Sequence, residues 1–258
     1  MILTGDYHTH TTYSHGKGSV FDNVKKAKEI GLKEIGITDH GFSHPAFGLN
    51  KRKLPKLRED VKMAEKEFGV KTYLGIESNL LSSQGDVDLK EKDYNKFDLF
   101  LVGVHKFVLY KPKAIFNMFI PNFFTSSFNG KPTKNLIKIN TKAYVNAIKK
   151  HPIDVITHLN FCCFADVLEV AKASADYGTY IELNGKKKHL SKEELYLLSK
   201  ENVNFIINSD AHSPKRVGEV SLVEELLKDG VIKEDKIANI NGKTPEFRFK
   251  KYKEEKGI

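Results

Sequence analysis

Short apolar runs that end in a histidine, a glutamate or an aspartate recur along this chain and constrain its fold more than any other feature. Seven of its ten histidines stand in such positions, together with one Glu and one Asp. These motifs are His8-Thr9-His10, His15, Thr38-Asp39-His40, Gly75-Ile76-Glu77, Val104-His105, Thr157-His158 and Ser209-Asp210-Ala211-His212. Because one arrangement must explain all of them, we expect the ends of these runs to converge in space.

The apolar runs alternate with amphipathic segments. The runs predicted as strands are Ile2–Tyr7, Glu34–Thr38, Lys71–Ile76, Phe97–Val104, Ile153–Thr157, Tyr180–Leu183 and Val203–Asn208. The segments predicted as helices are 19–30, 51–68, 139–150, 164–177, 191–201, 215–229 and 244–255. Ser191 and Glu194 have the spacing of a capping box, and Gly31 and Gly178 fall where helices should end.

Strands that alternate with helices indicate βα units and a parallel sheet. Seven strands with polar groups at their carboxyl ends favour an α/β fold of the barrel type, a distorted (β/α)7 TIM-like barrel with its site on that face. A doubly wound open sheet is the alternative. It gathers ligands at a switch point between few strands, so it explains seven converging strand ends less well.

Length and composition bound the class of protein. The chain of 258 residues is 40% apolar, and we interpret it as a single domain over 1–258. Its two cysteines, Cys162 and Cys163, are adjacent, so a disulfide framework is not expected and a cytoplasmic location fits. We see neither a signal peptide nor an apolar run long enough to span a membrane, and no membrane partner is expected. The net charge of +9 favours anionic partners, but dispersed lysines are typical of a solvated surface.

The segment 108–138 departs from the alternating pattern. It contains five phenylalanines and is interrupted by Pro112, Pro121, Asn129-Gly130 and Pro132. This aromatic content argues against disorder. We expect an insertion that forms a lid or a contact between subunits beside the site, with extra helices packed on the outside as an equal alternative.

The motifs favour a metal centre. His8 and His10 are two residues apart, as are Asp210 and His212, so in an extended strand each pair can reach one ion. Neutral imidazole and carboxylate ligands suit Zn, Mn or Fe, and Glu77 can bridge two ions with its two oxygens. Paired metals are a recurring device for phosphoester hydrolysis. Each motif alone is weak, and their joint occurrence at strand ends carries the prediction.

The sequences DYHTHTTYSHG, ITDHG, LGIESNLLSSQGDVDL, VGVHK, VITHLN and NSDAHSPKRVGE resemble those of the polymerase and histidinol phosphatase (PHP) superfamily, especially its small bacterial stand-alone phosphatases. The resemblance runs from Asp6 to about Gly218 and implies a distorted barrel with three divalent metal ions. It implies three ligand sets, namely His8, His10, Glu77 and Asp210; Glu77, His105 and His158; and His15, His40 and His212. The segment 108–138 looks longer than in compact members, which leaves the substrate open.

The resemblance implies a metal-dependent phosphatase that hydrolyses small phosphate monoesters with metal-activated water, histidinol phosphate being one specific version. We expect Glu77, His105, Asp210 and Arg216 to act in catalysis, with Arg216 holding a phosphate oxygen. Lys215 and Lys106 are alternative phosphate ligands. Asp6 and Asp39 are candidates to orient imidazoles, and Asn184 to reach the site. His44, His151 and His189 are expected to be structural, and Cys162 and Cys163 to be inert.

Three other functions compete. A phosphodiesterase or nuclease acting on nucleotides or DNA ends would need a basic track to the site, and the dispersed lysines do not supply one. A non-catalytic metal-binding module would lack ligands, whereas all nine positions hold ligand types. Another metal hydrolase, such as an amidohydrolase, would want a different bridging group where Glu77 stands. The expected partner is therefore a small phosphorylated substrate, with nucleic acid less favoured.

Overall fold

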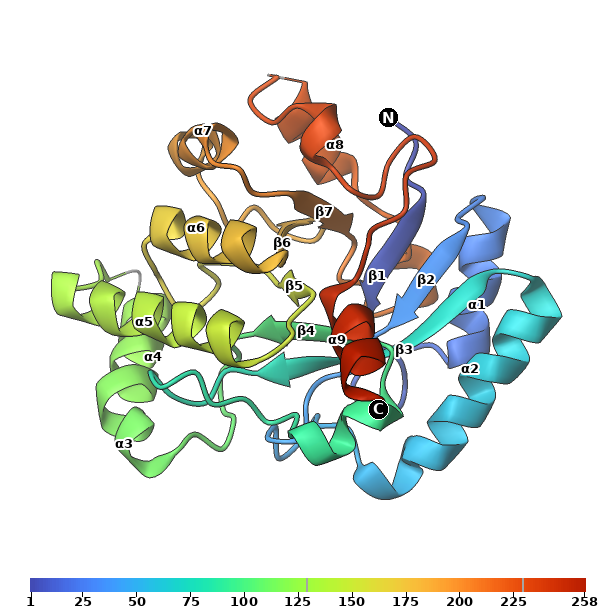
Figure 1. Cartoon of the computed structure of the whole chain (residues 1–258), viewed down its shortest axis with the longest axis horizontal. Coiled ribbons are helices and arrows are strands. Elements are labelled where there is room, and N and C mark those ends of the chain that lie inside the picture. Colours follow the sequence, from blue (N-terminus) through green and yellow to red (C-terminus); the bar gives the residue numbers. More distant parts are fainter. Residues whose placement is uncertain (129, 229) are drawn as a thin grey trace.

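The computed structural model of the chain describes residues 1–128, 130–228 and 230–258 and contains a parallel sheet of seven strands in chain order (Figure 1). The strands are β1 (Gly5–Thr9), β2 (Glu34–Ile37), β3 (Lys71–Asn79), β4 (Leu99–Gly103), β5 (Val155–Ile156), β6 (Tyr180–Asn184) and β7 (Phe205–Asn208). Each strand pairs in parallel with the next, and helices surround the sheet. The predicted α/β fold, a distorted seven-stranded barrel, is confirmed, and the open doubly wound sheet is wrong.

The helices largely follow the predicted segments. They are α1 (Val20–Glu29), α2 (Leu54–Phe68), α3 (Pro112–Ala114), α4 (Ile120–Ser127), α5 (Lys134–Lys150), α6 (Val167–Tyr177), α7 (Lys192–Lys200), α8 (Ser221–Leu227) and α9 (Arg248–Lys256). Ser191 and Glu194 form the predicted capping box of α7. Gly178 ends α6 in a left-handed conformation, with a φ of 69°, as its position predicted.

Several elements differ in their bounds from prediction, and helix α5 begins at Lys134 instead of at position 139. Strand β3 runs three residues beyond Ile76, so Glu77 lies inside a strand because this segment pairs with β4 through Asn79. The helix expected at 215–229 begins only at Ser221, since Pro214–Arg216 forms a 3-10 turn and Gly218 takes a φ of +71°. The last position of that expected helix, 229, and position 129 of the aromatic segment lie outside the described residues.

The barrel is almost closed between β1 and β7. Near the carboxyl ends, the backbone of His10 donates to Ala211 O at 2.8 Å. Deeper in the seam, side chains replace the missing ladder. The Asn208 Oδ1 atom accepts from Tyr7 N at 2.9 Å, and Asn239 bonds both Ile207 and the Gly5 carbonyl. These amides satisfy buried backbone groups that a continuous sheet would have paired.

Alternation along the strands divides the barrel interior into two layers. At the amino end, Leu99, Leu101, Val155 and Ile206 form an apolar cluster with Tyr7 and Phe247. Helix α9 covers this end, since Phe249 N bonds Asp154 ahead of β5 (Figure 1). Two positions further along the same strand faces, Tyr180 is followed by Glu182 and Ile206 by Asn208, and both of these residues are polar. The polar layer therefore sits at the carboxyl ends.

The aromatic segment forms helices on the outside of the barrel. Between α3 and α4 the residues Ile115–Phe119 are π-helical, and the whole stretch packs beside α5 (Figure 1). Paired amides of Asn122 and Asn140 fix it there, with donor–acceptor distances of 2.8 and 2.9 Å. No helix in the described residues is both long enough and apolar enough to cross a membrane.

Candidate metal centre

The predicted ligands all converge at the carboxyl ends of the strands. Each comes from the end of a strand or from the loop that follows it, apart from Glu77, which lies within β3. Glu77 stands at the centre and is fully buried. The nine predicted ligands are His8, His10, His15, His40, Glu77, His105, His158, Asp210 and His212.

The carboxylate of Glu77 faces imidazoles from four other strands or loops. Its Oε1 atom lies 2.8 Å from His158 Nε2, 3.2 Å from His105 Nε2 and 3.3 Å from His8 Nε2. Its Oε2 atom lies 2.9 Å from His40 Nδ1. Two oxygens with different sets of neighbours suit a carboxylate that bridges two cations.

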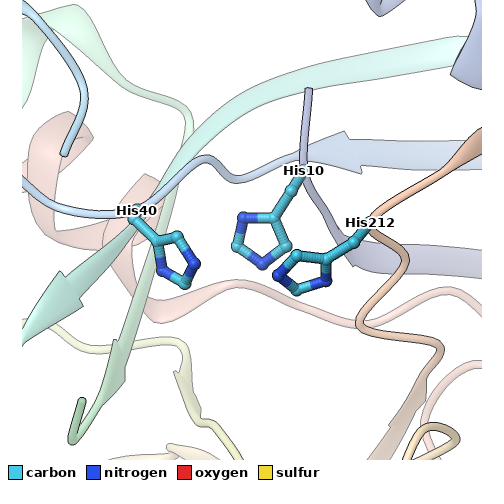
Figure 2. Close-up of side chains that lie close together, drawn as sticks. All are labelled: His10, His40 and His212. Atoms are coloured by element: carbon cyan, nitrogen blue, oxygen red, sulfur yellow. The ribbon is translucent and has the colours of Figure 1, made fainter. Parts of the chain in front are cut away.

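Asp210 organises the opposite side of the cluster. Its Oδ1 atom lies 3.2 Å from His212 Nδ1 and 3.4 Å from His10 Nε2. Figure 2 shows His10, His40 and His212 gathered together, and His10 has its ring centroid 4.3 Å from those of both other rings. The ring of His15 lies 4.4 Å from that of His212.

Three groups of donors have the spacing of metal sites, with their ligand atoms within 4.8 Å of one another. They are His8, His10 and Asp210; His40, Glu77 and His105; and His10, His40 and His212. The first matches part of the first ligand set implied by the resemblance. The second group contains His40 where the implied second set has His158. The third group contains His10 where the implied third set has His15.

Two outer residues fix which imidazole nitrogen faces the centre. His8 donates its Nδ1–H to Glu182 Oε1 at 2.7 Å, and His105 donates its Nδ1–H to Asn79 Oδ1 at 2.8 Å. In a neutral ring the Nε2 atom then carries a lone pair. Both Nε2 atoms face Glu77 Oε1, an arrangement that is repulsive unless a metal ion or a proton lies between the atoms. This arrangement fits a metal ion.

Buried polar atoms without partners lead to the same conclusion. Within the described residues, His10 Nδ1, His40 Nδ1, Glu77 Oε2 and His158 Nδ1 have no hydrogen-bond partner. Such atoms are costly to bury unless something compensates them. Because the donor set consists of nitrogen and carboxylate oxygen, divalent transition metals fit it.

Electrostatics keep the two carboxylates of the cluster, Glu77 and Asp210, ionised at neutral pH. Burial lowers the pKa of His40 to about 3 and, with neighbouring imidazoles, holds the pKa of His10 well below its ordinary value. Burial opposes the ionised form of Glu77, but His105 and His8 outweigh it and hold the pKa of Glu77 well below its ordinary value. Burial opposes the charged forms of His8 and His158, but Glu77 outweighs it and raises the pKa of both imidazoles, that of His8 well above its ordinary value. Ionised carboxylates thus lie beside two imidazoles that are held neutral and two that attract positive charge.

A cleft of about 320 Å³ opens above the cluster. Beyond the predicted ligands it is lined by residues from four loops, those after β2, β4, β5 and β6. They are His44, Phe47, Lys106, Phe107, Phe161, Lys186, Lys187 and His189. Lys186 reaches the cluster itself, since its Nζ atom lies 3.0 Å from His212 Nδ1 and 3.4 Å from Asp210 Oδ2. Three lysines therefore surround a small opening with aromatic walls.

Several residues lie elsewhere than the sequence suggested. Arg216 and Lys215 are not among the residues that line the cleft, so a phosphate-binding role for Arg216 stays a prediction without geometric support. Asp6 and Asp39 accept hydrogen bonds from backbone and hydroxyl groups rather than from imidazoles. Asn184 does reach the site, donating to Glu182 Oε2 at 2.9 Å.

The three histidines expected to be structural separate into two kinds. His151 bonds Tyr94 and Gly85, far from the cluster, as expected. His44 and His189 instead line the cleft, because the loops after β2 and β6 fold over its mouth. Burial lowers the pKa of His189 to about 4.

Sequence reasoning missed Glu182 and the lysine pair at 186–187. Glu182 is a fully buried carboxylate within β6, and it accepts hydrogen bonds from His8, His158 N, Asn184 and Asn208. An ionisable residue inside an otherwise apolar strand was the available signal, as it was for Glu77. The lysine pair directly follows that strand and lay in a run interpreted as solvated surface.

A parallel barrel with imidazole and carboxylate donors at its strand ends defines a metal-binding enzyme scaffold. The PHP domain family matches residues 6–209, and the chain belongs to this family. A probable phosphatase of Thermoanaerobacter sp. (strain X514) is 30% identical over 264 residues, which cover 96% of this chain and 95% of that protein. A probable phosphatase of Clostridium acetobutylicum is 26% identical over 98% of this chain and 95% of its own length.

A solved structure has the same fold. Histidinol phosphate phosphatase from Lactococcus lactis, determined with zinc, L-histidinol and phosphate, superposes with a TM-score of 0.64. It is 18% identical, and the match covers 95% of this chain and all of that one. Together with its relatives, the family identifies the chain as a phosphatase.

Proposed function

We propose that the protein hydrolyses small phosphate monoesters with three divalent ions, Zn, Mn or Fe, bound at the strand ends. The observation that carries the proposal is the pair of imidazole nitrogens, Nε2 of His8 and Nε2 of His105, that face the carboxylate of Glu77. The proposed ligand sets are those implied by the resemblance. They are His8, His10, Glu77 and Asp210; Glu77, His105 and His158; and His15, His40 and His212.

When bound, divalent ions in such a site polarise phosphoryl oxygens and activate water at neutral pH. The residues of the chain do the rest. Glu77 and Asp210 hold the cations, and Glu182 and Asn79 keep two imidazoles turned toward them. Positive charge for the remaining phosphate oxygens comes from Lys106, Lys186 and Lys187, which line the same cleft.

The size of the cleft supports a small substrate. About 320 Å³ lies at the lower end of the range for small-molecule sites. The aromatic walls formed by Phe47, Phe161 and His189 suit a flat organic group on the ester. Histidinol phosphate is the specific candidate, supported by the L-histidinol bound in the Lactococcus lactis structure. A phosphodiesterase that acts on nucleic acid ranks below it because a polymer needs a longer groove.

We also propose that the described fold is one domain over 1–258 in which 108–138 is an insertion beside the cleft. Phe107, the residue directly before that insertion, lines the cleft and supports this proposal. A reducing cytoplasm is proposed from the two free thiols at 162 and 163.

A substrate panel tests the function. Phosphate monoesters, including histidinol phosphate, and diesters, including short oligonucleotides, would be compared with added Mn, Zn or Fe. We expect monoester hydrolysis that requires metal and is abolished by Glu77→Gln, with exposed Glu193→Gln as the matched control. Diesters cleaved faster than every monoester, or full activity in a folded Glu77→Gln variant, would overturn the proposal.

A further inference from the structure

The net charge of the chain is concentrated in one stretch. Residues 99–153 contain nine lysines and no Arg, Asp or Glu. Removing these nine lysines from the 42 basic residues of the chain leaves 33, equal to its 33 acidic residues. The rest of the chain is therefore neutral, and the whole excess of +9 belongs to β4, the aromatic segment and α5.

Those lysines point to an anionic partner. Eight of the nine are exposed, and the ninth, Lys106, is half-buried. Within the described residues none of them forms an ion pair. Elsewhere on the surface lysines do pair, as Lys51 does with Asp93 at 2.6 Å. An unneutralised cationic surface attracts negative charge over about a Debye length.

An exposed apolar ridge lies within this cationic stretch. We call Leu109, Phe116, Ile120, Phe124 and Phe128 the phenylalanine ridge; these side chains are 36% to 75% exposed. The last four recur at every fourth position, and the rings of Phe124 and Phe128 stack with centroids 5.9 Å apart. Large apolar side chains gathered in one exposed patch mark an interaction surface.

The ridge is not the buried face of its helices. The opposite side of the same stretch already packs inward through Ala114, Met118 and Asn122. From 114 to 130 the sequence contains no charged residue, whereas Lys111, Lys113 and Lys131 flank it. An exposed apolar ridge that is flanked by lysines matches the two requirements of a peripheral contact with an anionic membrane, namely apolar side chains for the interface and cations for the headgroups.

Other occupants fit less well. A second copy of the chain would bring two surfaces of strong positive charge together, which opposes association. A nucleic acid strand prefers lysines interleaved with aromatic rings, whereas here the charges stand only at the flanks. Aliphatic Leu109 and Ile120 offer no face on which a base can stack.

The ridge lies next to the catalytic cleft. Phe107, which lines the cleft, has its ring centroid 5.6 Å from that of Phe123 in α4. Lys106, another lining residue, donates from Nζ to Ser127 Oγ at 3.2 Å. A surface held by the ridge is therefore close to the mouth of the cleft.

We propose that the phenylalanine ridge and its flanking lysines dock the protein on the surface of a bilayer that contains anionic lipid. The ridge side chains enter the interface, and the lysines contact lipid phosphates and carboxylates. The expectation of no membrane partner rested on the lack of a spanning segment and does not bear on a peripheral contact of this kind.

Vesicle flotation of the full-length protein tests the proposal. We expect it to float with vesicles of phosphatidylcholine and phosphatidylserine, and to remain at the bottom with phosphatidylcholine alone or in high salt. The double variant Phe116→Ser/Phe124→Ser should weaken the partitioning at least about tenfold, from the transfer free energy of the two rings. Hydrolysis of a soluble aryl phosphate should not change, because neither residue contacts the cleft.

Matched variants separate the causes. Met63→Ser/Leu197→Ser removes two exposed apolar residues from other helices and should float like the wild type. Lys111→Glu/Lys113→Glu should release the protein, whereas Lys25→Glu/Lys62→Glu, with the same change of charge, should not. Failure of the wild type to float with anionic vesicles would overturn the proposal. So would a dimer dissolved by the ridge variant, or oligonucleotide binding lost with it in the absence of vesicle binding.

Discussion

Replacing Glu182 with Gln tests how the site fixes its histidines. The carboxylate accepts from His8 Nδ1 and Asn208 through one oxygen, and from His158 N and Asn184 through the other. An amide can accept on one side only, so its NH₂ group must face two donors. If this side is toward His8, that ring can bond it only by shifting its proton to Nε2, which removes the lone pair aimed at the metal centre.

The magnitude follows from these contacts. Changes to residues that orient a metal-ligating histidine cost about 10- to 100-fold in metal affinity. A buried donor left without a partner costs about 1–3 kcal/mol of stability. We therefore expect Glu182→Gln to bind Zn or Mn about 10- to 100-fold more weakly and to unfold at a lower urea concentration.

The assay is calorimetric titration of metal into the apoprotein, with circular dichroism to confirm folding. Glu193→Gln on the exposed side of α7 removes the same charge far from the cluster and is the control. Wild-type metal affinity in a folded Glu182→Gln variant would refute the tautomer argument. An equal loss in the control would show that net charge alone is responsible.

Three further changes have predictable outcomes. A Cβ atom at position 103 would lie 2.4 Å from Thr157 Oγ1 and 2.7 Å from His158 Cε1. Because His158 would have to move, Gly103→Ala should lower kcat/KM about 100-fold while the protein stays folded. Unchanged kinetics would contradict this close packing. Asn239→Ala leaves three backbone groups of the β1–β7 seam without partners and should cost about 3 kcal/mol or more in urea unfolding, whereas a smaller loss would mean that water replaces the amide. Burial raises the pKa of Asp154 to about 7, so the folded state retains a proton that the unfolded state loses above about pH 4. The contribution of Asp154 to the free energy of unfolding therefore falls by about 4 kcal/mol from pH 4 to pH 7. Over that range the Asp154→Asn variant should become more stable relative to the wild type. Parallel plots of unfolding free energy against pH for the two proteins would exclude this role.

The strand ends were predictable because their signals are local. An apolar run followed by His, Asp or Glu identifies both a buried strand and its carboxyl end, and parallel strands bring those ends to one edge. The nine ligand positions follow from this rule, and the structure brings all nine together. Glu77 was found although β3 continues past it, since the motif marks the residue and not the boundary.

Residues whose roles depend on distant partners could not be predicted in the same way. In the sequence, Glu182 is an isolated glutamate in a predicted strand, with no partner nearby along the chain. Its role is visible only in the fold, where its Oε1 atom lies 2.7 Å from His8 Nδ1. Arg216 follows the last ligand motif closely, but it lies in the 3-10 turn at 214–216 and is not among the residues that line the cleft, whereas Lys186 is. Which loop covers the mouth of a barrel is decided by packing between segments far apart in sequence.

The aromatic segment shows the same division. The sequence by itself determined its phenylalanines, its lack of acids and its prolines, and therefore that it would be ordered and cationic. Only the tertiary structure decided which side chains face α5 and which face solvent, because both sides of these helices are apolar and periodicity cannot choose between them. Sequence thus determined the candidate metal ligands, through local strand-end chemistry, and tertiary packing decided what surrounds them.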